Sequence, residues 1–173
     1  MYRNVWKINE RATPAIAYTA GGLYRGEVVA KTNVSRVLNW IRTANAPKYL
    51  HFTKVTVLPM GPNARPSNYN GLFVPVADMI AFHLMPPANE PLDYDADEKN
   101  RVMADTTALV GSMVFSGKMR FSSQMDAAQS LEMQKLPWMS FYEVNISNPF
   151  VPQMTIQVPM VVLAPAKVAM GYT

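Results

Sequence analysis

A nine-residue pattern that occurs twice places the strongest constraint on how this chain can fold. Residues 49–57 read Tyr-Leu-His-Phe-Thr-Lys-Val-Thr-Val, and residues 138–146 read Trp-Met-Ser-Phe-Tyr-Glu-Val-Asn-Ile. The β-branched and aromatic residues of both copies favour a β-strand. The apolar alternation of both copies slips by one residue at the same place, near residues 53–54 and 142–143. We therefore expect a β-bulge at each of these two positions.

Two further matches indicate that the whole chain is an internal duplication. Residues 24–28 match residues 115–119 at an offset of 91, and residues 71–81 match residues 159–169 at an offset of 88. Each unit then has the order strand, turn, strand, helix, bulged strand, loop, strand, turn, strand. Five short, bent strands in about 70 residues favour a small barrel. We predict a mainly β protein with short helices, made of two tandem five-stranded barrels.

Glycines set the hairpins that we expect. The first strand should begin at residue 15, with glycines 21–22 as a kink and a tight turn at Arg25-Gly26. The equivalent turn of the second unit falls at Ser116-Gly117. Together with the duplication, these strands and turns predict four segments. They are an N-terminal arm (1–14), a first barrel (15–85), an acidic linker (86–105) and a second barrel (106–173).

Two helices are expected, one in each unit. An apolar stripe at helical spacing predicts a helix over residues 33–43 with an N-cap at residues 32–33. A weaker pattern predicts a helix over residues 123–132, with Ser123 and Asp126 as a capping pair. The stripe of the first helix consists of Val34, Val37, Leu38 and Ile41.

The hairpin, the long bent strand, the variable loop and a last hairpin closing on residues 76–82 resemble the Sm-like (or SH3-like) small β-barrels. More specifically, the unit of strand, helix and strand resembles uncharacterised bacterial domains grouped with that superfamily, and the resemblance covers residues 15–84 and 106–172. The resemblance implies rings formed through edge strands. The Arg-Gly pair that RNA-binding Sm-like proteins carry near the last hairpin is missing at residues 76–78 and 164–166, so no RNA-binding residue is transferred.

The composition narrows the classes of function. Of the 173 residues 49% are hydrophobic and only 16% are charged, with 14 prolines and 13 methionines, which indicates much buried surface, including surface buried between copies. The absence of cysteine excludes disulfides and thiolate metal sites. No apolar run approaches the roughly 18 residues of a membrane span, and residues 1–10 lack the apolar core of a signal peptide. We expect a cytoplasmic protein without membrane insertion.

No group of residues indicates catalysis. His51 and His83 lie between apolar neighbours on predicted strands, and a metal site needs three or four ligands. The acidic residues 93–98 lack the glycine and the closing glutamate of a calcium loop, so we interpret them as a solvated linker. We therefore expect a protein that is not an enzyme, with no catalytic residue, no metal, no cofactor and no evident small-molecule substrate.

A basic group in the first half leaves two interpretations open. Residues 1–84 carry a formal charge of +7, residues 85–107 carry −4 and residues 108–173 carry +1. Basic residues beside an exposed aromatic ring suit single-stranded nucleic acid. The other interpretation is that the tryptophan closes one end of the barrel and that the charges are solvated. The group consists of Arg36, Trp40, Arg42, Lys48 and Lys54.

Two functions follow as expectations. The first is a structural or assembly protein, a homo-oligomer or polymer that forms a ring or a filament through its edge strands. The alternative is a module that binds single-stranded nucleic acid, with RNA as the partner, through the basic first half.

Overall fold

The structure is a computed structural model that describes residues 7–61, 63–133 and 135–172. The chain forms two compact units, Met1–Glu90 and Pro91–Thr173. Both units are built mainly from antiparallel strands, so the prediction of a mainly β protein with short helices is confirmed. Among the described residues, no helix is long and apolar enough to cross a membrane.

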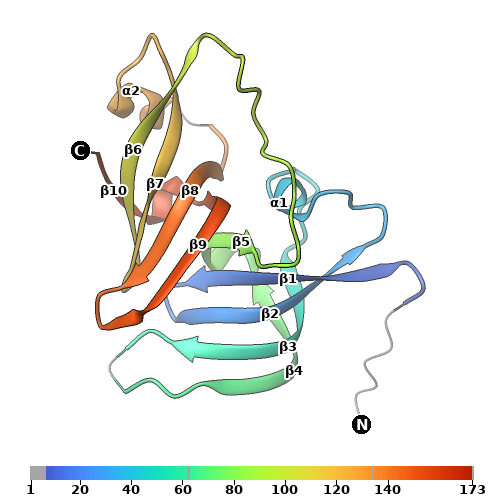
Figure 1. Cartoon of the computed structure of the whole chain (residues 1–173). Helices are drawn as coiled ribbons and strands as arrows, with labels where there is room; N and C mark the ends of the chain where they lie inside the picture. Colours follow the sequence, from blue (N-terminus) through green and yellow to red (C-terminus); the bar gives the residue numbers. More distant parts are fainter. Residues whose placement is uncertain (1–6, 62, 134, 173) are drawn as a thin grey trace. The chain divides into compact units, whose positions relative to one another are not determined.

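Unit 1 is a five-stranded antiparallel sheet in the order β5-β1-β2-β3-β4. Figure 1 shows β1 to β4 lying side by side in chain order, with β4 at the lower edge. The elements are β1 (Glu10–Thr19), β2 (Gly22–Lys31), α1 (Val37–Trp40), β3 (Tyr49–Pro59), β4 (Ser67–Pro75), the 3-10 helix η1 (Val76–Asp78) and β5 (Met79–Leu84).

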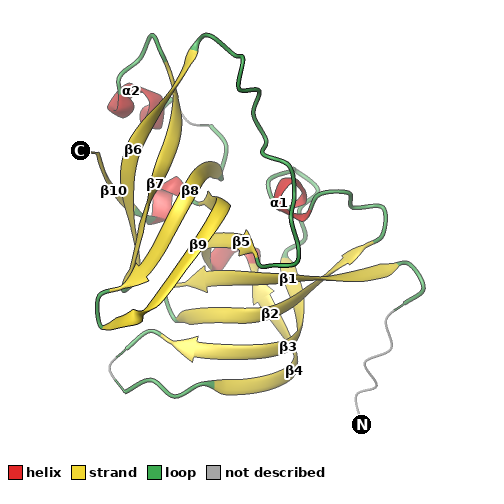
Figure 2. Cartoon of the chain, in the orientation of Figure 1, coloured by secondary structure: helices red, strands yellow, loops and turns green. Residues whose placement is uncertain are grey.

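Unit 2 repeats this arrangement in the order β10-β6-β7-β8-β9. Along the chain, its helix α2 follows the second strand and precedes the third, as α1 does in unit 1 (Figure 2). The identical order agrees with the predicted duplication. The elements are β6 (Arg101–Val110), β7 (Met113–Ser122), α2 (Ala127–Glu132), β8 (Met139–Asn148), β9 (Val151–Leu163), η2 (Pro165–Lys167) and β10 (Ala169–Tyr172).

Neither unit closes into a barrel through strand pairing among the described residues. Strands β4 and β5 of unit 1 are not hydrogen-bonded to each other, and neither are β9 and β10 of unit 2. The strand pairs therefore give an open sheet in each unit and do not confirm the two predicted five-stranded barrels.

The bulge predicted in the repeated strand is present in both units. Arg25 pairs with Thr56 and Glu27 pairs with Thr53, so Gly26 alone faces two residues of β3. One of these two, Lys54, has a positive φ of 51°. The register between β7 and β8 shifts in the same way, between Ser116 and Lys118.

The two glycines predicted as hairpin turns lie inside strands instead. The turns fall at residues 20–21 and 111–112. A Cβ on Gly26 would lie 2.8 Å from the Thr53 carbonyl oxygen, and one on Gly117 would lie 2.7 Å from that of Tyr142. The sequence needs glycine here because two backbones approach closely at a bulge, so the predicted turns at Arg25-Gly26 and Ser116-Gly117 are wrong.

The first helix is much shorter than predicted. Instead of residues 33–43 it covers Val37–Trp40, and its N-cap residue Arg36 makes no side-chain capping bond. The Glu90 carboxylate accepts from the backbone N–H groups of Val37 and Leu38 at 2.5 and 3.2 Å. A residue distant in the sequence thus replaces the N-cap predicted at residues 32–33.

The second helix begins later than predicted but keeps its predicted cap. It covers Ala127–Glu132 rather than residues 123–132. Asp126 is the N-cap residue, and its carboxylate accepts from the Gln129 N–H at 2.8 Å. Ser123 lies ahead of the helix and is not its cap.

The acidic segment before β6 packs onto unit 2 rather than remaining solvated. The Asp93 carboxylate accepts from the hydroxyl groups of Ser140 at 2.5 Å and Tyr142 at 2.7 Å. Glu98 forms an ion pair with Arg120 at 2.8 Å. The interpretation of residues 93–98 as a solvated linker is therefore wrong for Asp93 and Glu98, which have partners on β8 and β7, whereas Asp95 and Asp97 are exposed.

Candidate functional site

The structure does not gather all five predicted nucleic-acid residues into one surface. Arg36, Trp40 and Arg42 lie in or beside α1, and Lys48 directly precedes β3. Lys54 lies six residues further along, which is about 20 Å at the usual rise of a strand. The group therefore divides into a set near α1 and a separate lysine at the bulge.

Two of the five residues, Trp40 and Lys54, have contacts that make them less available to nucleic acid. Trp40 is half-buried and lines a pocket of about 460 Å³ with Glu10 and Lys31, so its ring does not stand free on the surface. Lys54 is 70% exposed, but its Nζ lies 3.1 Å from Glu27 Oε1. A lysine in an ion pair offers less charge to a phosphate than an unpaired one.

An exposed aromatic surface lies on the outer two strands of unit 1, and we call it the β3–β4 aromatic face. It consists of Tyr49, His51 and Phe73. His51 and Phe73 are direct cross-strand partners, and their rings stack with centroids 4.6 Å apart and an angle of 17°. Phe73 is 66% exposed and Tyr49 is 56% exposed. Stacked rings open to solvent offer a flat apolar surface to a partner.

The strand that carries Phe73 also ends the sheet. Strand β4 pairs with β3 and has no strand on its other side among the described residues. Its sequence, Ser-Asn-Tyr-Asn-Gly-Leu-Phe-Val-Pro, contains no charged residue. Natural edge strands are usually protected by charge, by proline or by being short. Strand β4 is nine residues long and has a proline only at its last position.

This surface was hard to predict from the sequence because residues 59–70 have the composition of a loop. Proline, glycine and asparagine are frequent in that stretch, and this composition is typical of a loop rather than a strand. The indication available from the sequence was the pair of aromatic residues Tyr69 and Phe73, four residues apart, because this even spacing puts both on one face of a strand.

The two histidines do not form a metal site. His51 lies on the surface in the stack with Phe73, whereas His83 is fully buried. In the part of the chain that the structure describes, no three His, Cys, Asp or Glu side chains are grouped to hold a metal ion.

His83 is held neutral by its surroundings. Its Nδ1 lies 2.9 Å from the Leu84 carbonyl oxygen and donates to it, so Nε2 accepts from the Tyr18 hydroxyl at 3.0 Å. Burial lowers the pKa of His83 to about 4 and raises that of Tyr18 well above its ordinary value. This pair is a satisfied polar contact in the core of unit 1.

Comparisons with protein-family models, with curated proteins and with solved structures return no match.

Proposed function

We propose that this protein is a non-enzymatic assembly protein whose copies join head to tail. In this arrangement strand β4 of one copy pairs with strand β10 of the next copy. The single observation that carries the proposal is the long, uncharged and unpaired edge of β4.

The backbone of β4 supplies the attraction. About half of the N–H and C=O groups of an edge strand point away from its only neighbour and are open to another strand. Strand β10 is the complementary edge, since it pairs only with β6 among the described residues. It also has no charged residue, and its Tyr172 is 71% exposed. Pairing by strand addition takes its affinity mostly from main-chain hydrogen bonds.

The charges of the two units favour this orientation over pairing of like units. Residues 1–90 hold ten Lys or Arg and four Asp or Glu, a formal charge of +6. Residues 91–173 hold six and eight, a formal charge of −2. A contact between unit 1 of one copy and unit 2 of the next therefore joins opposite charges. A head-to-tail contact gives a ring if the rotation closes and a filament if it does not.

We also propose that each unit is a small open barrel of the Sm-like or SH3-like kind, bent like a barrel but without hydrogen bonds between its fourth and fifth strands. The support is the strand order, with the last strand beside the first, the bulge that bends the third strand, and the single 3-10 turn before the last strand. A protein of this kind in a bacterial cytoplasm would assemble through the same edges that the Sm-like family uses.

The test is the mass of the purified protein in solution. We expect light scattering to give a mass that rises with protein concentration and falls as salt is raised from about 0.05 to about 1 M, since salt screens the opposite charges. Electron microscopy then distinguishes a ring from a filament. A single monomer mass across the whole concentration range contradicts the proposal.

A variant localises the contact to β4. Asn70→Lys puts a charge on the exposed edge, and we expect it to shift assembly to at least tenfold higher protein concentration. The matched control, Asn45→Lys, adds the same charge to unit 1 on an exposed loop residue outside the sheet. Equal assembly of the two variants would place the contact elsewhere.

The β3–β4 aromatic face favours a second candidate, the binding of single-stranded nucleic acid. In proteins that bind single-stranded nucleic acid, bases stack on exposed aromatic rings. The positive net charge of unit 1 suits a phosphate backbone. We expect Phe73→Ala to weaken a salt-sensitive gel shift with single-stranded RNA by about tenfold, at about 1–3 kcal/mol per stacked base. The absence of a shift with wild-type protein at low salt removes this candidate.

A further inference from the structure

Unit 2 contains a pocket that neither the assembly proposal nor the sequence assigns to a function. Its volume is about 510 Å³, within the range of sites that hold small molecules. It lies among the segment before β6, the end of β7, helix α2 and the start of β8, and all of its lining belongs to unit 2.

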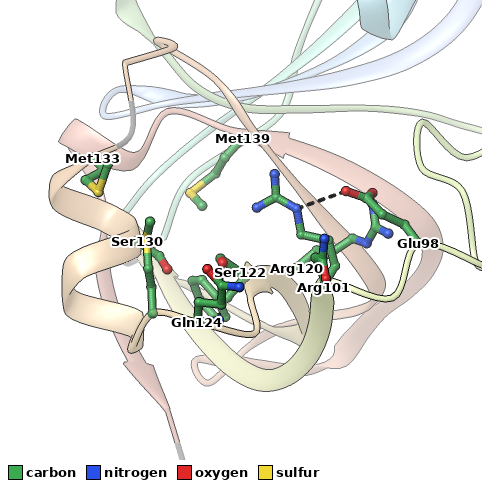
Figure 3. A pocket seen from close by; sticks show the side chains of 11 residues that line it. Glu98, Arg101, Arg120, Ser122, Gln124, Ser130, Met133 and Met139 are labelled. Carbon is green, nitrogen blue, oxygen red and sulfur yellow. Dashed lines mark hydrogen bonds and ion pairs between the residues drawn. The ribbon is translucent and has the colours of Figure 1, made fainter.

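The pocket has a charged side and an apolar side. Figure 3 shows Glu98, Arg101 and Arg120 together on one side of the pocket. Met133 lies on the far side beside α2, and Met139 lies between it and Arg120, with Ser122 and Gln124 next to Met139. Methionine side chains adapt to apolar ligands of varied shape. The pocket thus suits a molecule with one charged end and one apolar end.

The net charge of the lining residues indicates whether the charged end of the ligand is an anion or a cation. Glu98, Arg101 and Arg120 are its only charged lining residues, so their sum is +1. Arg120 already has partners within the protein, because its Nη1 pairs with Glu98 at 2.8 Å and its Nη2 donates to the Asp95 carbonyl oxygen at 2.8 Å. A cationic ligand would have to displace these contacts, whereas an anion would neutralise the remaining positive charge of the lining.

Arg101 is the residue free to receive the anion. Its Nε lies 3.4 Å from Glu98 Oε1, and its side chain is 45% exposed. Its two terminal nitrogens have no hydrogen-bond partner among the described residues. A guanidinium edge of this kind binds a carboxylate with two parallel hydrogen bonds.

A second observation also indicates an occupant. The Ser130 hydroxyl is buried in the wall of the pocket and has no hydrogen-bond partner within the described part of the chain. Buried hydroxyl groups in proteins almost always have a partner. Met133, on the apolar side, is 60% exposed. Both features are explained if a ligand covers the methionine and offers a polar atom to Ser130.

We propose that this pocket binds a small amphiphilic carboxylate. Arg101 holds the carboxylate, the methionines cover the apolar chain, and Ser130 hydrogen-bonds a polar atom of the ligand. This site is independent of the edge of β4, since the two lie in different units.

The test uses three probes of equal chain length on the full chain, namely octanoate, 1-octanol and octyltrimethylammonium. Methyl-labelled methionine allows NMR to follow Met133 and Met139 directly. We expect saturable shifts of these two methyl groups with octanoate, at least tenfold weaker binding of 1-octanol and no saturable binding of the cation. Equal affinity for octanoate and octanol, or unsaturable shifts spread over the methionines outside the pocket, overturns the proposal.

A variant then tests the role of Arg101. Arg101→Gln should weaken octanoate at least tenfold, whereas the matched control Arg25→Gln, on an exposed arginine of unit 1, should leave it unchanged. An unchanged affinity in Arg101→Gln overturns the assignment of the carboxylate to this residue. The comparison of the three probes needs no variant and decides the ligand class even if a substitution disturbs folding.

Discussion

Lys54 and Glu143 occupy the same position in the two units and have the same unusual backbone conformation, with φ of 51° and 52°. Each lies at the bulge of the third strand and forms an ion pair with the second strand. Lys54 pairs with Glu27 at 3.1 Å, and Glu143 pairs with Lys118 at 2.5 Å. The hydrogen bond and the charge of Glu143 raise the pKa of Lys118. The duplicated units therefore keep one backbone geometry with the charges exchanged.

This geometry predicts that glycine is preferred to alanine at the bulge. A positive φ costs a residue with a Cβ about 1 kcal/mol, and glycine avoids that cost. Lys54→Gly and Lys54→Ala lose the same exposed ion pair, so the difference between their free energies of unfolding measures the cost of the positive φ alone. We expect the glycine variant to be about 1 kcal/mol more stable in urea unfolding. Equal stability of the two variants would show that Lys54 is not strained.

The glycines that face the bulges should tolerate no side chain. A Cβ on Gly117 would lie 2.7 Å from the Tyr142 carbonyl oxygen, and backbone cannot move away as a side chain can. We expect Gly117→Ala to lower the free energy of unfolding by about 3 kcal/mol, at the upper end of overpacking effects. Gly61→Ala is the matched control, since nothing lies within 4 Å of its added Cβ. Similar losses in both variants would contradict this explanation.

The bulges were predictable from the sequence because a slip in alternation moves every later side chain to the other face. Phe52 and Val55 in unit 1 are both buried although they are three residues apart, which a regular strand does not allow. Periodicity also identified the buried side chains of α1, namely Val37, Leu38 and Ile41.

The turns and the acidic contacts were not predictable from local sequence. Glycine at position 26 fits a tight turn as well as it fits a close backbone approach, and only the partner strand distinguishes them. Glu90 and Asp93 find their partners 53 and 49 residues away. No short-range pattern reports such distances, so Asp93 was interpreted as a solvated charge and the contact of Glu90 was not predicted. The charged side of the pocket in unit 2 was missed for the same reason.

The contact of Glu90 with α1 predicts a measurable loss of stability. Its carboxylate satisfies two backbone N–H groups that a four-residue helix cannot satisfy internally. We expect Glu90→Ala to cost about 1–2 kcal/mol of unfolding free energy, as loss of a cap does. Glu132→Ala removes an exposed carboxylate of α2 and serves as the control, with an expected change below about 0.5 kcal/mol. Equal effects would mean that the Glu90 contact contributes nothing.

The buried His83 predicts that the protein loses stability as pH falls. Its pKa is lowered from 6.5 to about 4 by burial, so between these values the unfolded chain binds a proton that the folded chain does not. The free energy of unfolding therefore falls as pH decreases through this range. The full effect is about 3 kcal/mol, at 1.36 kcal/mol per pKa unit. Above pH 6.5 the His83 imidazole is neutral in both the folded and the unfolded chain, so it adds no pH dependence to the free energy of unfolding.

Urea unfolding at a series of pH values between about 7.5 and 4 measures this effect. Carboxylates titrate in the lower part of the range, so the quantity to compare is the difference between the wild-type protein and His83→Gln. Glutamine keeps an acceptor for the Tyr18 hydroxyl but binds no proton. We expect the variant to lose about 3 kcal/mol less than the wild type on acidification, while His51→Gln controls for the removal of a histidine. A variant that follows the wild-type curve would show that the buried imidazole is not the group responsible.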